Sequence, residues 1–254
     1  NLGTESISRL LRAFAVPSII AMLVSALYNI VDQFFIGRSV GELGNAATNI
    51  TFPLTTSCIA IALLLGIGAA SAFNLTLGEG NKDKALYFVG NSALLLFTSG
   101  VVLCIIIQIF LEPMLMFFGS PENVLGYAKS YTRITAIGFP FLIFATGGGH
   151  LIRADGSPTY SMLCNLSGAI INVILDPIFI FGLNMGMAGA GLATIIGQIF
   201  GAGLALRYMF NYKTGRLHKK HLIPRWKFVR RIISLGAAPC FNQLAMMIVQ
   251  IVMN

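Results

Sequence analysis

Long apolar segments, each ended by a short break, make up most of the chain. Each segment has at least the roughly 20 residues that a helix needs to cross the hydrocarbon core of a bilayer. The breaks combine Gly, Pro and Asn with charged residues, which is typical of turns between helices. We therefore expect seven membrane-spanning helices, at residues 10–37, 47–77, 85–111, 124–152, 158–183, 187–212 and from about 229 to the last residue.

The composition predicts the same fold class. The chain has 254 residues, of which 56% are hydrophobic and 10% charged, and its mean hydropathy is +0.80. Soluble domains are about a quarter charged, and one of this size could not bury so much apolar surface. The sequence thus predicts an all-α, polytopic membrane protein whose first partner is the lipid bilayer.

Basic residues are distributed unevenly over the predicted loops. The net charge is +8, and Lys and Arg gather before the first span, after the second, after the fourth and, most densely, in residues 213–231. This alternation is the positive-inside pattern, which places the N-terminus in the cytoplasm of a multi-pass protein of the cell inner membrane. A basic cluster beside membrane spans favours a cytoplasmic loop, so no nucleic-acid partner is expected.

The sequence shows no residue pattern typical of a disulfide framework, a metal site or a catalytic centre. The four Cys are scattered singly through apolar runs, and the three His have no metal-ligand spacing. No Ser/His/Asp or Cys/His set with plausible geometry stands out. We therefore expect a protein that is not an enzyme, has no disulfide framework and needs no cofactor.

Two carboxylates interrupt the apolar spans. Asp176 lies in the segment 169–182, one helical turn after Asn172 and directly before Pro177. Residues four apart share one face of a helix, and the proline removes a backbone donor and bends the helix. Asp32 lies in the first span. An ionisable group at such a position is expensive to bury and by default marks function.

The polar residues of three spans lie at a common depth. Asp32 and Asp176 lie about five and seven residues before the outer ends of their spans, and Thr194 about seven residues after the outer start of its span. At 1.5 Å per residue, all three are about 8–11 Å below the outer surface, with Asn172 one turn deeper. Carboxylate, amide and hydroxyl oxygens suit a hard cation or a proton. We therefore predict a cation-binding site for H⁺ or Na⁺, with no other metal.

Each of these residues also has a structural interpretation. Asp32 alone could reach the lipid headgroups, Asn172 could hydrogen-bond between helices, and Thr194 could be a packing hydroxyl. Asp176 is the hardest of the four to explain in this way, because Pro177 and bulky apolar residues flank it.

A weak internal repeat predicts a longer protein. Residues 14–32 resemble residues 236–254, and the Pro17-to-Asp32 spacing equals that from Pro239 to Asn254. Both copies would start from the cytoplasm, as in a parallel repeat. We expect a six-helix lobe at 1–212, a basic linker at 213–228 and the start of helix 7 of a second lobe at 229–254, so that the chain is a truncated product or a fragment.

Several motifs carry a resemblance to the multidrug and toxic compound extrusion (MATE) family of secondary transporters. These motifs are LYNIVDQFFIG after Pro17, LIRADGSPTYSM, NVILDPIFIFGLNMGMAGAGLATIIGQ and the basic loop between spans six and seven. The resemblance covers essentially the whole chain. It implies half of a twelve-helix fold, in which two six-helix lobes surround a central cavity. It also implies export of amphipathic, cationic drugs or toxins, as small-molecule substrates, in exchange for H⁺ or Na⁺.

The resemblance assigns roles to particular residues. The motif positions of the family's N-lobe cation site fall on Asp32, Asn172, Asp176 and Thr194, and Pro17 falls on a proline proposed to bend helix one. It also implies that the C-terminal lobe of the same full-length protein is a partner.

Two other functions remain open. A lipid-linked oligosaccharide flippase of the same superfamily would need several basic residues in the cavity, for which only Lys129 and Arg133 are available in the outer portions of the spans. A half-length membrane protein without transport activity of its own is the other alternative.

Overall fold

Helices account for all the regular structure in the described part of the chain, residues 6–253 of the computed structural model. The elements are α1 (Ile7–Val40), α2 (Glu42–Gly78), α3 (Lys82–Phe117), α4 (Glu122–Ala154), α5 (Pro158–Pro177), the π-helix η1 (Ile178–Gly182), α6 (Gly186–Phe210), α7 (Lys219–Leu222) and α8 (Trp226–Met253). Within this range, seven segments are long and apolar enough to cross a membrane, η1 counting with α5. The predicted number and order of spans are confirmed, whereas Asn254, the end of the repeat, lies outside the described residues.

Two predicted boundaries are wrong. The second helix begins at Glu42 and not at residue 47, and the third runs to Phe117 although the sequence predicts a break from residue 112. Pro113 is accommodated inside α3 by a local kink at Phe110, whose φ of −105° and ψ of 24° are not helical. A proline clashes with the preceding turn of its own helix, so the distortion falls just before it.

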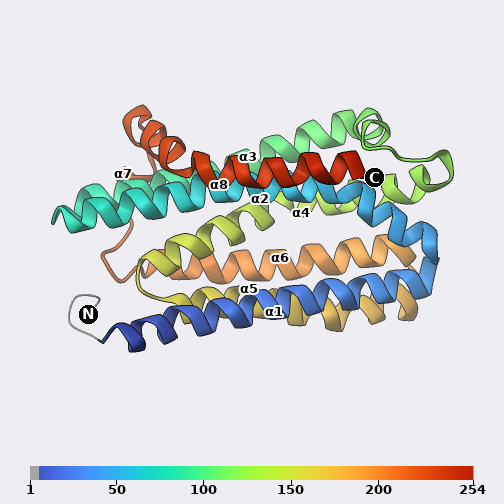
Figure 1. The fold of residues 1–254 in the computed structure, drawn as a ribbon, viewed down its shortest axis with the longest axis horizontal. Helices are drawn as coiled ribbons and strands as arrows, with labels where there is room; N and C mark the ends of the chain where they lie inside the picture. Colours follow the sequence, from blue (N-terminus) through green and yellow to red (C-terminus); the bar gives the residue numbers. More distant parts are fainter. Residues whose placement is uncertain (1–5, 254) are drawn as a thin grey trace.

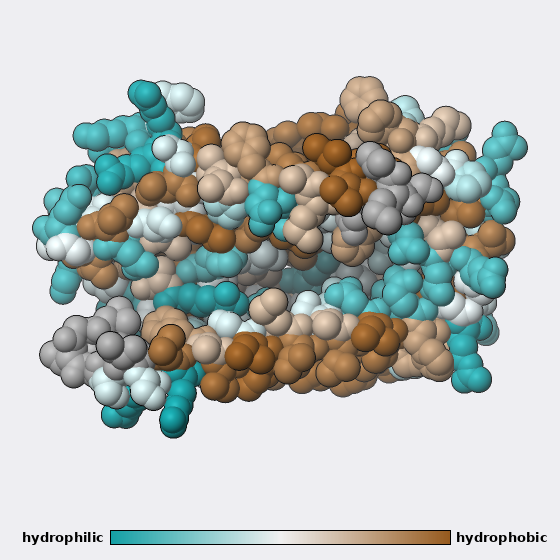
Figure 2. Space-filling model, in the orientation of Figure 1, coloured by the Kyte–Doolittle hydropathy of each residue, from teal (hydrophilic) through white to brown (hydrophobic). Residues whose placement is uncertain are grey.

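The helices run side by side along the long axis of the molecule (Figure 1). At the end called here the basic end are the α2–α3 turn, the α4–α5 turn and the segment 211–225. At the other end, called the distal end, are the α1–α2, α3–α4 and α5–α6 connections. Hydrophilic residues gather at both ends, and the surface between them is mainly hydrophobic (Figure 2). This distribution is the one a membrane-spanning bundle requires.

Helix α4 lies at the centre of the bundle. It packs against α2, α3, α5 and α6, whereas α1 packs chiefly against α5, and α8 chiefly against α2. Close packing at α4 depends on small residues, as expected where helices meet in a membrane. A Cβ added at Gly66 of α2 would lie only 2.6 Å from the Gly147 Cα of α4. The backbones of α2 and α8 also touch, where Gly68 faces Ile232 and Gly236 faces Leu64.

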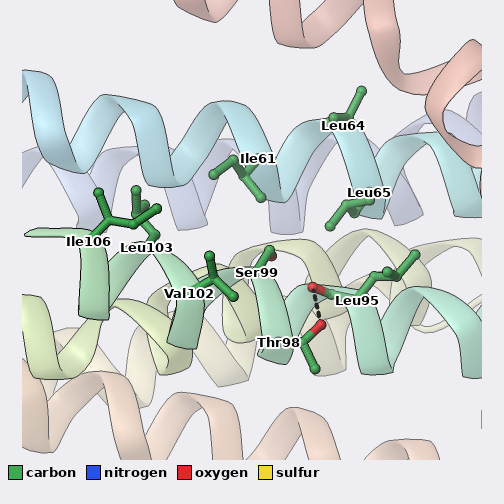
Figure 3. Close-up of a pocket in the computed structure, with 9 residues that line it drawn as sticks. All are labelled: Ile61, Leu64, Leu65, Leu95, Thr98, Ser99, Val102, Leu103 and Ile106. Atoms are coloured by element: carbon green, nitrogen blue, oxygen red, sulfur yellow. Dashed lines mark hydrogen bonds between the residues drawn. The ribbon is translucent and has the colours of Figure 1, made fainter.

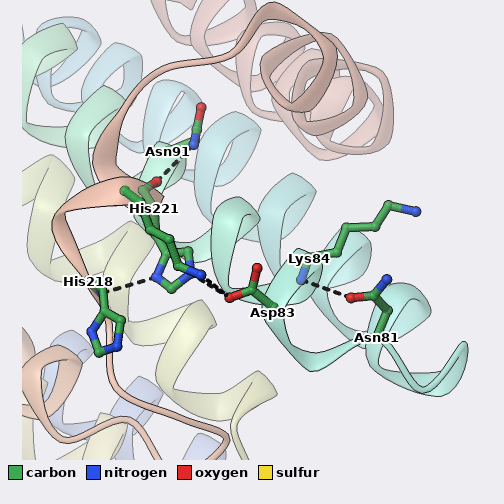
Figure 4. Close-up of polar contacts among 7 residues, drawn as sticks. Asn81, Asp83, Lys84, Asn91, His218 and His221 are labelled. Carbon is green, nitrogen blue, oxygen red and sulfur yellow. Dashed lines mark hydrogen bonds and ion pairs between the residues drawn. The ribbon is translucent and has the colours of Figure 1, made fainter.

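The segment that joins α6 to α8 is fastened to α3 (Figure 4). The Asn91 amide nitrogen of α3 donates to the carbonyl oxygens of His221 (3.0 Å) and Ile223 (3.2 Å), and its oxygen accepts from the Arg225 N–H (2.9 Å). Because Asn91 is fully buried, these bonds satisfy backbone groups that water cannot reach. The predicted linker 213–228 is therefore an ordered strap that contains α7 and the first turn of α8.

Charged groups complete the attachment of this strap. His221 Nε2 lies 3.1 Å from Asp83 Oδ1, and Lys220 Nζ lies 2.6 Å from the same oxygen. The hydrogen bond to Asp83 raises the pKa of the Lys220 ammonium group. A second fastening starts at Asp155 in the α4–α5 turn, which accepts hydrogen bonds from the Tyr208 hydroxyl (2.9 Å) and the Lys213 N–H (2.6 Å).

Candidate cation-binding site

A cavity of about 390 Å³ lies between α1 and α2, over a floor made by α4, α5 and α6. In Figure 2 the molecule is hollowed between α1 and the helices above it, and hydrophilic residues line the hollow. The polar lining residues are Ser25, Tyr28, Asn29, Thr55, Thr146, Arg153, Asn165, Asn172, Thr194 and Gln198. The remaining lining is apolar, so the cavity suits an amphipathic molecule.

A somewhat larger cavity, of about 470 Å³, lies between α2 and α3 (Figure 3). Its lining is almost entirely aliphatic. The Thr98 and Ser99 hydroxyls donate to carbonyl oxygens of their own helix, Leu94 and Leu96 respectively, so neither needs a ligand. We therefore place the functional site in the polar cavity and not in this apolar one.

Asn172 is the centre of a hydrogen-bond network at the distal end of the polar cavity. With its amide oriented to satisfy both atoms, Nδ2 donates to Asp176 Oδ2 at 3.2 Å, and Oδ1 accepts from the Thr194 N–H at 3.2 Å and from Thr194 Oγ1 at 3.3 Å. Asp176 and Asn172 are buried, with exposed fractions of 0% and 3%. Three of the four predicted site residues are thus joined directly, across α5 and α6.

Glycine allows α5 and α6 to approach this closely. Gly168 of α5 and Gly197 of α6 face one another, and a Cβ added at Gly197 would lie 2.6 Å from the Gly168 oxygen. The same Cβ would lie 3.5 Å from Asn172 Cβ. The short interhelical distance at this point brings the Asn172 amide within reach of Thr194.

Asp32 joins the same network from α1. Its carboxyl group lies next to that of Asp176, and its exposed fraction is only 7%. A hydrogen bond between two carboxyl groups requires a proton on one of them. Within residues 6–253, Asp32 Oδ1 has no hydrogen-bond partner. The helix-end interpretation of Asp32, in which the side chain reaches the headgroups, does not describe this buried position.

In the described part of the chain, no basic side chain forms an ion pair with either of the two carboxylates. Among the residues that the structure describes, the Lys, Arg and His ion pairs involve Glu79, Asp83 and Glu112, and not Asp32 or Asp176. A buried pair of carboxylates without a cation is strongly unfavourable. The orphaned Asp32 oxygen, the second carboxylate and the Thr194 hydroxyl therefore fit a proton or a small hard cation such as Na⁺.

Sequence reasoning missed two tyrosines at this site. Tyr28, one turn before Asp32 on α1, and Tyr131, on α4, both lie close enough to Asp32 and Asp176 to interact electrostatically with them, and Tyr131 also lies beside the Thr194 hydroxyl. The sequence spacing could have indicated both tyrosines. Tyr28 is four residues from Asp32, and Tyr131 is nine residues from the distal end of α4, near the depth predicted for the carboxylates.

Polar contacts hold the distal end of the cavity together. Gln33 Nε2 donates to Thr48 Oγ1 at 2.9 Å, which joins α1 to α2 directly beside Asp32. The Thr51 and Thr132 hydroxyls lie 2.8 Å apart and join α2 to α4. Both contacts are internal, so they position α1, α2 and α4 around the carboxylates.

The two prolines have different surroundings. At Pro177, α5 ends and the chain continues as the π-helix Ile178–Gly182, a rare form that is frequent at functional sites. Pro17 is buried inside α1, which is helical on both sides of it. Bending at Pro17 stays a prediction.

These features together define a class: a multi-pass α-helical membrane protein with a polar cavity and a buried carboxylate pair. Comparison with known proteins identifies the family. The MatE family model matches residues 17–178, and the chain belongs to this family.

Several known proteins are similar to this chain. The chain is 29% identical over 245 residues to the multidrug export protein MepA of Staphylococcus haemolyticus, covering 96% of this chain and 54% of MepA. It is 29% identical over 209 residues to a FAD transporter of Shewanella oneidensis, covering 81% of this chain and 46% of that protein. The structure of the MATE multidrug transporter DinF-BH in complex with rhodamine 6G matches with a TM-score of 0.93 and 36% identity, covering 100% of this chain and 57% of DinF-BH. The chain thus spans about half the length of these relatives.

Proposed function

We propose that the protein is the N-terminal lobe of a cation-coupled antiporter that exports amphipathic, cationic drugs or toxins across the cell membrane. The observation that carries this proposal is the buried pair Asp32 and Asp176, hydrogen-bonded through Asn172 to Thr194, at the distal end of a polar cavity. Groups of this kind inside a membrane mark ion pathways and proton relays.

The chemistry of the pair explains how an ion gradient could drive export. Two adjacent carboxylates repel one another, so the pair binds a proton or Na⁺ when it faces the side where the ion is abundant. Binding neutralises one charge and strengthens the contact between α1 and α5. A bound cation favours the conformation in which it makes the better contacts, and its release on the other side reverses that preference.

The drug substrate is proposed from the relatives and from the cavity. MepA is named a multidrug export protein, and the DinF-BH structure contains rhodamine 6G. In this chain the apolar lining of the cavity includes Met22 and Phe52, and flexible or aromatic side chains adapt to varied ligands. A second relative is named a FAD transporter, and FAD is an anion.

The orientation in the membrane is part of the proposal. The basic end carries the densely charged segment 211–225, and the positive-inside rule supports a cytoplasmic location for this end and for the start of α1. The carboxylate pair then lies near the outer face of the inner membrane. The relatives are about twice as long, which supports a C-terminal lobe as the partner that closes the cavity.

The flippase alternative needs several basic residues in the cavity, and among the described residues that line it only Arg153 is basic. Lys129 forms an ion pair with Glu112 at 2.8 Å, and Arg133 is exposed on the same helix. Neither residue lines the polar cavity.

Transport in reconstituted vesicles tests the proposal. The full-length protein is reconstituted into liposomes, and rhodamine 6G movement is followed by fluorescence under a proton gradient and, separately, a sodium gradient. We expect transport with at least one gradient, and its loss in Asp32→Asn and Asp176→Asn. Glu122→Gln is the matched control, because Glu122 is an exposed carboxylate in the first turn of α4. Wild-type rates in both Asn variants, or no response of the wild type to either gradient, would refute the coupling mechanism.

A further inference from the structure

Arg153 is a cationic side chain at the opposite end of the polar cavity from the carboxylate pair. It lines the cavity close to the end of α4, at the basic end of the bundle. Within residues 6–253, no acidic side chain forms an ion pair with it. The nearest acid in sequence, Asp155, is already bonded to Tyr208 and to Thr214. The Arg153 charge therefore faces the cavity without a counter-charge.

The position of the Arg153 guanidinium is fixed by its neighbours. Its Nε donates to the Ser161 Oγ at 3.2 Å, and Ser161 is fully buried. Gly149 provides the space for this contact, since a Cβ there would lie 3.1 Å from the same oxygen. One of the five N–H groups of the guanidinium is thus used, and the four on its two terminal nitrogens remain.

A second donor lies one helical turn along α5. Asn165 follows Ser161 by four residues, lines the same cavity, and has no hydrogen-bond partner among the described residues. Residues four apart on a helix share a face, so the Asn165 amide and the Arg153 guanidinium lie on the same side of α5. A guanidinium fork with an amide beside it is the arrangement that recognises carboxylate, sulfonate or phosphate.

The cavity joins this cationic end to the carboxylate end. Ser161 and Asn172 are eleven residues apart on α5, which corresponds to about 16 Å along the helix. Asn172 and Thr194 line the cavity at its distal end and connect to Asp176. A drug-sized molecule spans this distance, so its two ends can meet opposite charges.

We propose that Arg153, with Ser161 and Asn165, forms an anion-binding subsite for the cargo, so that the protein accepts amphipathic zwitterions that carry a carboxylate or similar anionic group. This inference rests on the proposed export function and deepens it by naming a substrate class. Purely cationic amphiphiles also bind, but they leave the guanidinium without a partner.

Two dyes that differ in one group provide the test. Rhodamine 6G is a cationic ethyl ester, and the free acid obtained by hydrolysis of that ester is a zwitterion with the same ring system. Binding of both dyes to the full-length protein in phosphatidylcholine nanodiscs is measured by fluorescence anisotropy. For Arg153→Gln we expect about tenfold weaker binding of the acid and unchanged binding of the ester. Arg153→Lys restores part of the affinity, and Arg207→Gln, an exposed arginine at the same end, changes neither dye.

Further variants and lipids separate the possible outcomes. Asn165→Ala removes an exposed side chain without partners, so it leaves the fold intact and weakens binding of the acid alone by about threefold. If Arg153→Gln and Asn165→Ala change both dyes equally or neither, the subsite is refuted while the export function stands. If the wild type binds neither dye, the proposed function fails. If adding phosphatidylglycerol abolishes the effect of Arg153, the guanidinium binds a lipid headgroup and the cargo proposal is overturned.

Discussion

Replacing glycines at the α5–α6 contact provides a graded test of the cation site. An ordinary contact of a Cβ begins near 3.4 Å, whereas a Cβ at Gly197 would lie 2.6 Å from the Gly168 oxygen, so the helices must separate by about 0.8 Å. At Gly168 the corresponding distance is 2.9 Å and the separation about 0.5 Å. At Gly201, opposite Cys164, the distance is 3.1 Å and the separation about 0.3 Å.

The expected effect follows from the hydrogen bonds that these glycines permit. The Asn172 oxygen lies 3.2 Å from the Thr194 N–H nitrogen and 3.3 Å from Thr194 Oγ1. A separation of about 0.8 Å moves both contacts past the roughly 3.5 Å limit of a hydrogen bond. Losing such bonds in a charged network costs about 1.5–3 kcal/mol, which corresponds to roughly tenfold to hundredfold weaker binding of the coupling ion.

The assay is the half-saturating concentration of the coupling ion for rhodamine 6G transport in proteoliposomes. We expect that concentration to rise most in Gly197→Ala, less in Gly168→Ala and least in Gly201→Ala. Gly203→Ala is the control on the same helix, because a Cβ there meets nothing within 4 Å, and alanine favours the helix by about 1 kcal/mol. Wild-type ion dependence in Gly197→Ala, or effects that do not follow this order, would show that the close approach of α5 and α6 does not build the site.

Other contacts predict separate outcomes. Asn91→Ala should release the strap 213–228 from α3, because three backbone groups lose their buried partner. Faster tryptic cleavage at Lys213 to Arg225 would show this, and an unchanged cleavage rate would contradict it. Thr51→Val should lower the free energy of unfolding by about 1–2 kcal/mol, because it leaves the Thr132 hydroxyl buried without its partner. The double variant Thr51→Val with Thr132→Val should lower it less. Equal losses in the single and double variants would exclude the interhelical bond. Asp155→Ala should destabilise the protein by about 3 kcal/mol in a thermal melt, because four donors lose one buried acceptor, and a melting temperature within a degree of wild type would refute this role.

The fold was largely predictable because membrane spans are recognisable in a sequence as long apolar segments. The length of the apolar segments fixed the number and order of the helices. The errors arose where a helix continues beyond the apolar core, at Glu42, or through a proline, at Pro113. At Pro113 the sequence predicts the end of a helix, whereas the packed helix α3 continues through the proline with a kink.

The candidate site was predictable only where the depth of a polar residue could be counted from the end of its helix. The count of depth put Asp32, Asp176 and Thr194 at one level, with Asn172 one turn deeper. The structure brings the four together. The approach of α1 to α5 and the position of Tyr131 depend on how helices pack, which spacing along one helix does not contain. Arg153 was counted only as a basic loop residue, because its lining of the cavity depends on the rotation of α4.

The glycine crossing of α2 and α8 has a mechanical consequence. Where the two helix backbones touch at Gly68 and Gly236, no side chain of either residue lies between them, so a displacement of one helix passes directly to the backbone of the other. Helix α8 is also joined to α3 by the strap at its N-terminal end, and the Ser57 hydroxyl of α2 donates to the Met247 sulfur towards its other end. A second lobe attached through α8 would therefore move together with α2, with no side-chain layer at the crossing to absorb the displacement.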